Sequence, residues 1–252
     1  MGAGAHVSRT VRLSVNLNKV ATVRNSRGGT VPSVVDAARV TIEAGAPGIT
    51  LHPRADARHV TFADVRDVAA LLAAHAGIEL NVEGDPRDDL LALVLEVRPA
   101  QCTLVPVRPG EITSQAGWSP NAGGAVERAV GVLRAAGVRV SLFVDPDEDA
   151  IRWASRVGGD RVELYTEPFA RAFVRGEVPA REVFARYVAA AELARGLGLG
   201  VNAGHDLDLE NLRTFRRLPH LDEVSIGHAL MSHALFVGLE RSVKDYLAAL
   251  AG

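Results

Sequence analysis

Histidines and carboxylates stand just after short apolar runs of this sequence, where they could exchange protons with a bound molecule. Imidazole titrates near neutral pH, and burial can bring a carboxylate into the same range, so the two types together can perform general acid/base chemistry. Half of the eight histidines occupy such positions. The residues that we expect to form this acid/base site are His52, His59, Glu83, Glu163, His205 and His228.

Glycine turns and nearby cations indicate that the same site binds phosphate groups. In SIGHALMSHAL, Gly227 precedes the opening turn of a predicted helix at His228, where backbone N–H groups can face an anion. VNAGHDL supplies a second glycine turn, which ends on Asp206. Further polar and cationic candidates near other strand ends are Asn16, Asn18, Lys19, Arg27, Arg54 and Arg58. We expect phosphorylated small molecules as ligands.

Lys19 stands out because the chain has only one other lysine, Lys244, against 26 arginines. An ammonium on a flexible stem can bind a ligand oxygen where a planar guanidinium fits poorly. Lys19 could instead form a buried ion pair with Glu163 or Glu83, or act as a Schiff-base nucleophile. The sequence leaves these alternatives open.

The elements that must position these residues alternate along the chain. Short runs rich in Val, Ile and Leu predict strands at 11–17, 47–52, 78–83, 101–106, 138–145, 161–165, 199–204 and 223–227. Helical spacing predicts helices at 33–46, 61–76, 124–137, 180–198 and 208–218. The strands read as apolar on both faces, which is typical of a parallel sheet covered by helices.

Eight β/α units in about 250 residues predict an α/β protein with the TIM (β/α)8 barrel fold and extra helices. An open doubly wound sheet is the alternative, but the first predicted strand lacks a GxGxxG turn. We expect a flexible N-terminal tail at 1–10 and a single barrel domain at 11–252. The longer segments 107–121 and 166–179 are candidates for a lid or a subunit contact.

Composition narrows the possible partners. A formal net charge of −2 gives no electrostatic case for nucleic acid or an anionic membrane. No apolar run approaches the roughly 20 residues of a membrane span, and the single cysteine, Cys102, fits a reducing cytoplasm and reads as core packing. Zinc is considered because His and Glu are present, but no HxH or HExxH pair occurs, so we predict no metal.

Several segments resemble, in order and spacing, those of the pyridoxine 5'-phosphate synthase family. They are VNLNKVATVRNSRGG, GITLHPRADARHVT, LNVEG, TLVPVRPGEITSQAGW, VSLFVD, VELYTEPFA, VNAGHDL and VSIGHAL. The similarity runs from about Val11 to Leu250. It implies a TIM barrel that forms octamers and condenses 3-amino-2-oxopropyl phosphate with 1-deoxy-D-xylulose 5-phosphate, releasing phosphate and water. It also implies that neither a metal nor an organic cofactor is required.

The resemblance implies a role for each matching residue. His52 and Glu83 would accept protons, His205 would donate one, and Glu163 would stabilise the transition state. The residues that would hold the aminoketone phosphate are Asn16, Arg27, Gly227 and His228. Arg54, His59 and Thr113 would hold the deoxyxylulose phosphate.

The chain departs from the better-known members of that family within the site itself. Asn18 and Lys19 stand where those members have Asp and His, Asp206 stands where they have Gly, and Tyr165 stands where His is common. We expect Asn18, Lys19 and Asp206 to contact substrate. Two other functions stay open: a Schiff-base aldolase or lyase that uses Lys19 on phosphosugars, and a noncatalytic barrel that binds phospholigands.

Overall fold

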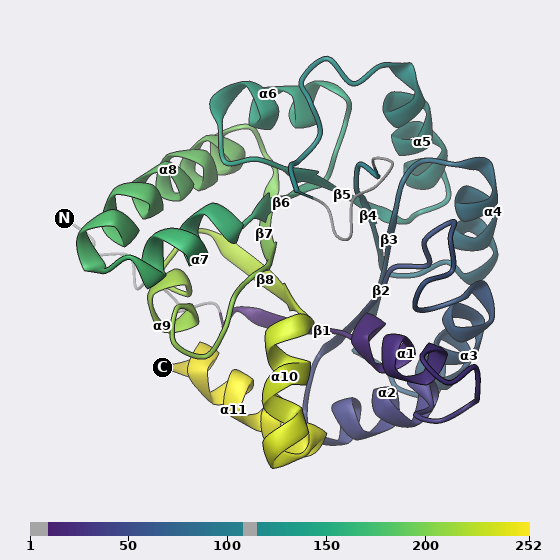
Figure 1. Cartoon of the computed structure of the whole chain (residues 1–252). Coiled ribbons are helices and arrows are strands. Elements are labelled where there is room, and N and C mark those ends of the chain that lie inside the picture. The colour runs from purple at the N-terminus through teal and green to yellow at the C-terminus, as the bar shows by residue number, and fades with distance from the viewer. Residues whose placement is uncertain (1–9, 108–114) are drawn as a thin grey trace.

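A closed barrel of eight parallel strands forms the centre of the computed structural model, which describes residues 10–107 and 115–252. Helices surround the barrel on all sides (Figure 1), and each strand pairs with the next one along the chain until β8 meets β1. The strands are β1 (Arg12–Asn16), β2 (Gly48–Leu51), β3 (Glu79–Gly84), β4 (Gln101–Leu104), β5 (Arg139–Val144), β6 (Arg161–Tyr165), β7 (Gly200–His205) and β8 (Leu221–Ile226). The predicted TIM barrel is confirmed.

The helices include more than one per strand at several connections, as the prediction of extra helices requires. They are α1 (Asn18–Asn25), α2 (Val34–Glu43), α3 (Phe62–Leu72), α4 (Asp88–Val97), α5 (Gly124–Ala135), α6 (Glu148–Arg156), α7 (Glu167–Val174), α8 (Glu177–Gly196), α9 (Leu212–Phe215), α10 (His228–Val237) and α11 (Leu239–Ala251). The sequence does not predict α1, which has few apolar side chains and no side-chain cap at its start.

Asp64 fixes both the start of α3 and the position of α1. Its carboxylate accepts from the Thr61 backbone N–H (2.7 Å), while the Thr61 hydroxyl accepts from the Asp64 N–H, which completes a capping box. The same carboxylate also pairs with Arg24 of α1. Burial raises the pKa of Asp64, but the hydrogen bonds from Arg24 and Thr61 together outweigh it, so the pKa is lowered. α1 is therefore tied to α3 at the rim of the barrel.

The strands alternate between an apolar outer face and a polar inner face, so the expectation of strands apolar on both faces is wrong. Hydrogen bonds that cross the barrel show which side chains face inward. Gln101 of β4 donates to Glu223 of β8 (3.4 Å), and Asn202 of β7 donates to both. Most of the polar side chains in the middle of the barrel, such as Ser14, Thr50 and Thr103, are short and buried, and hydrogen bonds with one another make that burial possible.

The helix predicted at 208–218 is much shorter than expected. Asp208 and Asn211 bond each other's backbone: the Asp208 carboxylate accepts from the Asn211 N–H (2.8 Å), and the Asn211 side chain accepts from the Asp208 N–H (3.0 Å). These local bonds hold a turn in place of the first helical turn, so α9 begins only at Leu212.

Other predicted segments fall partly or wholly outside the described residues. The tail at 1–10 lies there except for Thr10, and so does the central part of the segment 107–121. The segment 166–179 forms α7 and the first residues of α8. In the described part of the chain, no helix has the length and apolar composition that crossing a membrane requires.

Candidate active site

A cavity of about 860 Å³ opens at the carboxyl ends of the strands, where the active sites of TIM barrels form. Nearly all the residues proposed from sequence line it. They are Asn16, Asn18, Lys19, His52, Arg54, Arg58, His59, Glu83, Glu163, His205, Asp206, Gly227 and His228. The closed barrel brings together side chains from both ends of the chain, from Asn16 to His228.

Two predicted residues are not placed in the cavity. Arg27 is exposed in the turn after α1 and does not line it. Thr113 lies outside the described residues. Their proposed contacts with phosphate stay predictions.

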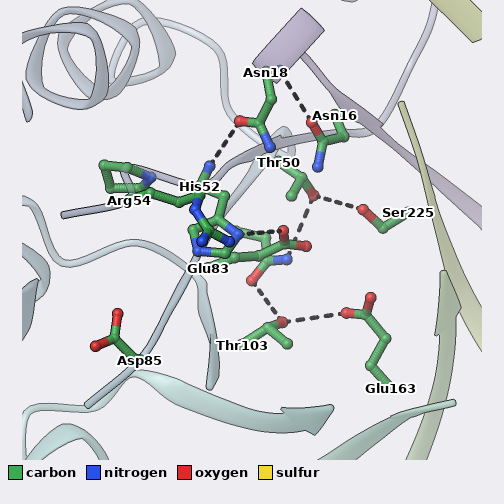
Figure 2. A network of polar contacts seen from close by, with 12 residues as sticks. Asn16, Asn18, Thr50, His52, Arg54, Glu83, Asp85, Thr103, Glu163 and Ser225 are labelled. Carbon is green, nitrogen blue, oxygen red and sulfur yellow. Dashed lines mark hydrogen bonds and ion pairs between the residues drawn. The ribbon is translucent and has the colours of Figure 1, made fainter. Parts of the chain in front are cut away.

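His52 and Glu83 form a buried pair at the centre of the site, seen in Figure 2. His52 Nδ1 lies 3.8 Å from Glu83 Oε2, and each residue is only 7% exposed. Burial, together with the charges of His59, Arg54 and Arg87, lowers the pKa of His52 to about 3. Burial raises the pKa of Glu83 to about 7. At neutral pH His52 is therefore a neutral imidazole beside a carboxyl group poised to gain or lose a proton.

The backbone around His52 is held by the strand 1 residues that the sequence singled out. Asn18 Oδ1 accepts from the His52 backbone N–H (2.9 Å), and Asn16 Oδ1 accepts from the Asn18 N–H (3.0 Å). Both bonds appear in Figure 2. The two amides thus link the end of β1 to the end of β2 and set the position of the imidazole.

Glu163 lies across the barrel from this pair and is also buried. Burial and the charges of Glu83 and Glu223 raise its pKa well above the usual range. Thr103 donates to Glu163 Oε2 (3.4 Å) and to Asn81 Oδ1, so the hydrogen-bonded layer of Figure 2 extends from Glu163 to Thr50 and Ser225. A protonated Glu163 could donate a hydrogen bond to an oxygen that gains negative charge.

Glycines at two strand ends make room for these groups. A Cβ on Gly204 of β7 would lie 2.5 Å from Glu163 Oε1, and a Cβ on Gly227 would lie 3.0 Å from the Cβ of Asn16. Any larger residue at Gly204 would displace the Glu163 carboxyl group. Gly227 also precedes the first turn of α10, where His228 lines the cavity.

Several buried polar atoms at the site have no hydrogen-bond partner within the described residues. They are His52 Nε2, Arg54 Nε and His59 Nδ1. Unsatisfied buried groups are costly, and they are retained where a ligand supplies the partner. Burial and the charges of Arg54 and Lys19 lower the pKa of His59 to about 4, so this corner is strongly cationic even with neutral imidazoles.

Lys19 lies in the first turn of α1 and lines the cavity. It is half-buried, and among the described residues no ion pair joins it to Glu83 or Glu163. The alternative of a buried ion pair is therefore wrong. Its charge acts on His59, which places Lys19 on the side of the cavity that Arg54 and His59 line.

The sequence did not identify a further set of lining residues. Glu167 and Arg171 reach the cavity from α7, and Phe143 and Tyr165 form an apolar wall with Val105. The i,i+4 spacing of Glu167 and Arg171 on one helix face was a usable signal. Phe143 could be identified as a lining residue only if it were known which side chains of β5 face into the barrel.

Cys102 is fully buried on β4, and burial raises the pKa of its thiol to about 12, as expected of a core residue. Within residues 10–107 and 115–252, no three His, Cys, Asp or Glu side chains come together as metal ligands would.

The closed barrel and its rim of buried acid/base and cationic groups define a TIM-barrel enzyme. The family model for "Pyridoxal phosphate biosynthesis protein PdxJ" matches residues 13–252. The chain belongs to this family, as the sequence resemblance predicts.

Relatives agree with that assignment, and a solved structure shows the same fold. A pyridoxine 5'-phosphate synthase from Bacteroides fragilis is 50% identical over 237 residues, which cover 93% of this chain and 97% of the relative. One from Leptospira biflexa is 47% identical over 252 residues, covering 95% and 97%. A thiamine phosphate pyrophosphorylase structure from Pyrococcus furiosus shares the fold at 13% identity, with a TM-score of 0.62 and 96% of each chain covered.

Proposed function

We propose that this chain makes pyridoxine 5'-phosphate by condensing 3-amino-2-oxopropyl phosphate with 1-deoxy-D-xylulose 5-phosphate, with release of phosphate and water. Membership of the family and relatives named for this activity support the reaction. The observation on which the proposal rests most is the buried pair of His52 and Glu83, whose pKa values are shifted in opposite directions inside the cavity.

The protonation state of each buried group suggests whether it accepts or donates a proton in the reaction. Neutral His52 and ionised Glu83 accept protons as the amine of one substrate attacks the ketone of the other and water leaves. His205 donates a proton to a leaving oxygen. Glu163, whose raised pKa keeps it protonated, donates a hydrogen bond to an oxygen that becomes negative.

The two phosphorylated substrates require two anion sites. Arg54, His59 and Thr113 hold the deoxyxylulose phosphate, and Lys19 contacts its hydroxyls or phosphate. The aminoketone phosphate binds on the other side, to Asn16, Arg27, Gly227 and His228. The orphaned Arg54 Nε and His59 Nδ1 support the first assignment, and the start of α10 supports the second.

A reactive imine must be kept from water while the ring closes. The segment 107–121 is our candidate for the lid. Residues 115–121 of this segment are held beside the cavity, which Gln115 lines. The Trp118 indole donates to the Leu104 carbonyl (2.8 Å), and the Gly117 N–H donates to Asp145 Oδ2 (3.3 Å).

Incubation with both phosphates, followed by detection of pyridoxine 5'-phosphate, tests the reaction. We expect product with the unmodified protein. Glu83→Gln should reduce turnover by a factor of about 10² or more, the usual contribution of one acid/base group, while binding of inorganic phosphate persists. Absence of product from the unmodified protein would favour a barrel that only binds phospholigands.

A Schiff-base aldolase or lyase is less well supported, because such a lysine must be desolvated and Lys19 is only half-buried. Borohydride reduction in the presence of each substrate separates the two reactions. A covalent adduct on Lys19 would contradict the synthase reaction, in which the imine joins the substrates to each other.

We also propose the cellular compartment and the oligomeric state of the enzyme. The enzyme works in the cytoplasm as a homo-oligomer, an octamer by resemblance to its family, and needs no metal or organic cofactor. Its partners are phosphorylated small molecules, without nucleic acid or membrane.

A further inference from the structure

His205 and Asp206 end β7 with a backbone geometry that brings their side chains together. Successive side chains of a strand normally point to opposite faces. His205 has φ of 111°, a region that disfavours residues with a Cβ, and its Nδ1 lies 2.9 Å from Asp206 Oδ2. The strained backbone thus permits a hydrogen bond between neighbours that a regular strand would keep apart.

The backbone of Asp206 is held on both sides. The Thr166 hydroxyl donates to the Gly204 carbonyl (2.7 Å) and accepts from the Asp206 N–H (3.3 Å). The Asn211 side-chain amide donates to the Asp206 carbonyl (3.1 Å). Since Thr166 is fully buried, these bonds hold the Asp206 backbone at the point from which its side chain reaches His205.

Aromatic rings limit the orientation of the imidazole. The Tyr165 ring meets His205 edge-on with 5.4 Å between centroids, and the Phe143 ring lies 6.2 Å away. Glu83, on β3, is the acid whose charge acts on His205 from across the cavity. Asp206 thus bonds one ring nitrogen of His205, and the two aromatic rings pack against the imidazole.

We propose that Asp206 is a positioning residue for His205, which fixes the tautomer and the orientation in which Nε2 exchanges a proton with substrate. This inference rests on the proposed role of His205 as a proton donor. The proton leaves Nε2 of the imidazolium for a substrate oxygen, and the electrons of that N–H bond stay on Nε2. The ring becomes the neutral Nδ1–H tautomer, whose Nδ1–H still donates to the unprotonated Asp206 carboxylate.

A nitrogen NMR measurement on the full-length protein tests the tautomer without any turnover. With ¹⁵N-labelled histidine, and with the His205 signals assigned by their loss in His205→Gln, neutral His205 should carry its proton on Nδ1. In Asp206→Ala, the Nε2–H form should predominate. A neutral His205 without a proton on Nδ1, or a tautomer unchanged by Asp206→Ala, would overturn the proposal.

Kinetics give a second readout. Asp206→Ala should reduce kcat by about tenfold or more while KM changes by less than about twofold, and Asp206→Glu should recover part of kcat. Raised KM with unchanged kcat would instead assign Asp206 to substrate contact and overturn the positioning role.

The chain contains a matched control. His233 of α10 pairs with Asp245 of α11 at the same 2.9 Å, away from the cavity. Asp245→Ala should leave kcat and the His205 tautomer unchanged. If the unmodified protein forms no pyridoxine 5'-phosphate, the proposed function fails, whereas the NMR result still decides whether Asp206 sets the tautomer.

Discussion

Burial gives the acid/base residues of this site their properties. His52 is kept neutral and Glu83 is kept near half-protonation by the same loss of contact with water, because desolvation disfavours whichever form of a group is charged. At neutral pH His52 can therefore accept a proton, while Glu83 can either accept or release one, as a reaction with several proton transfers requires.

Glu83 should make the stability of the fold depend on pH. Its folded-state pKa of about 7 is above the usual value of 4.5, so its favourable contribution is complete below pH 4.5 and is lost as pH rises through 7. Relative to the unmodified protein, Glu83→Gln should gain on the order of 3 kcal/mol in unfolding free energy between pH 4.5 and 8, measured by urea unfolding. Exposed Glu210→Gln is the control and should show no such gain.

Lys19 should act in substrate binding. Lys19→Met should raise KM for 1-deoxy-D-xylulose 5-phosphate by about tenfold, because one charge-assisted contact is lost. Lys19→Arg should recover only part of this, since a planar guanidinium cannot replace a compact ammonium. Steady-state kinetics with each substrate varied provide the measurement, and near-normal KM in Lys19→Met would exclude the contact.

At the scale of elements, strand ends and their glycines set the distances within the site. β7 approaches β6 closely enough at Gly204 that the Glu163 carboxyl group occupies the space of a missing Cβ. The position of a catalytic group on one strand thus depends on the absence of a side chain on the next.

Gly204→Ala should therefore reduce activity through Glu163. The added methyl group forces Glu163 from its position, and we expect at least a tenfold loss of kcat and about 1–3 kcal/mol of stability lost to overpacking. Gly131→Ala is the matched control. Gly131 occupies an exposed position of α5, and an added Cβ would meet no neighbouring atom within 4 Å. It should stabilise the fold by about 0.5–1 kcal/mol and leave kcat unchanged. Thermal unfolding and turnover assays would show both effects, and full activity in Gly204→Ala would contradict the role of the close approach.

The strands could be predicted from sequence because each contains a short group of Val, Ile or Leu residues, and α2, α3, α5 and α8 could be predicted from their helical spacing. The helices α4, α6 and α7 are not among those that the sequence predicts. Polar Thr103 and Asn81 inside the barrel could not be predicted, because their burial depends on partners from other strands. The residue types of His52 and Glu83 made them candidates for acid/base groups. Their pKa shifts could not be predicted, because the burial that causes them exists only in the closed barrel. α1 could not be predicted because its position depends on the pair of Arg24 and Asp64.

For the whole molecule, exposed apolar side chains bear on the proposed assembly into an oligomer. Phe236 is 89% exposed, Val174 88% and Leu235 79%, and Leu235 and Phe236 are neighbours on α10, where contact with another subunit would cover them. Light scattering should give a mass several times the 26.7 kDa of the chain, with eight copies expected. Phe236→Asp should lower that mass. A mass of 26.7 kDa for the unmodified protein would contradict assembly into an oligomer.

His52 directly follows β2, while Glu83, Glu163 and His205 lie on β3, β6 and β7, so the closed barrel brings each group from a different β/α unit. Each strand leads into its own connecting segment, so a mutation or insertion in one segment alters one group and leaves the scaffold of the others intact. Such a site can evolve one component at a time. A change at Asn18, Lys19 or Asp206 could therefore alter one corner of the reaction centre without rebuilding the rest.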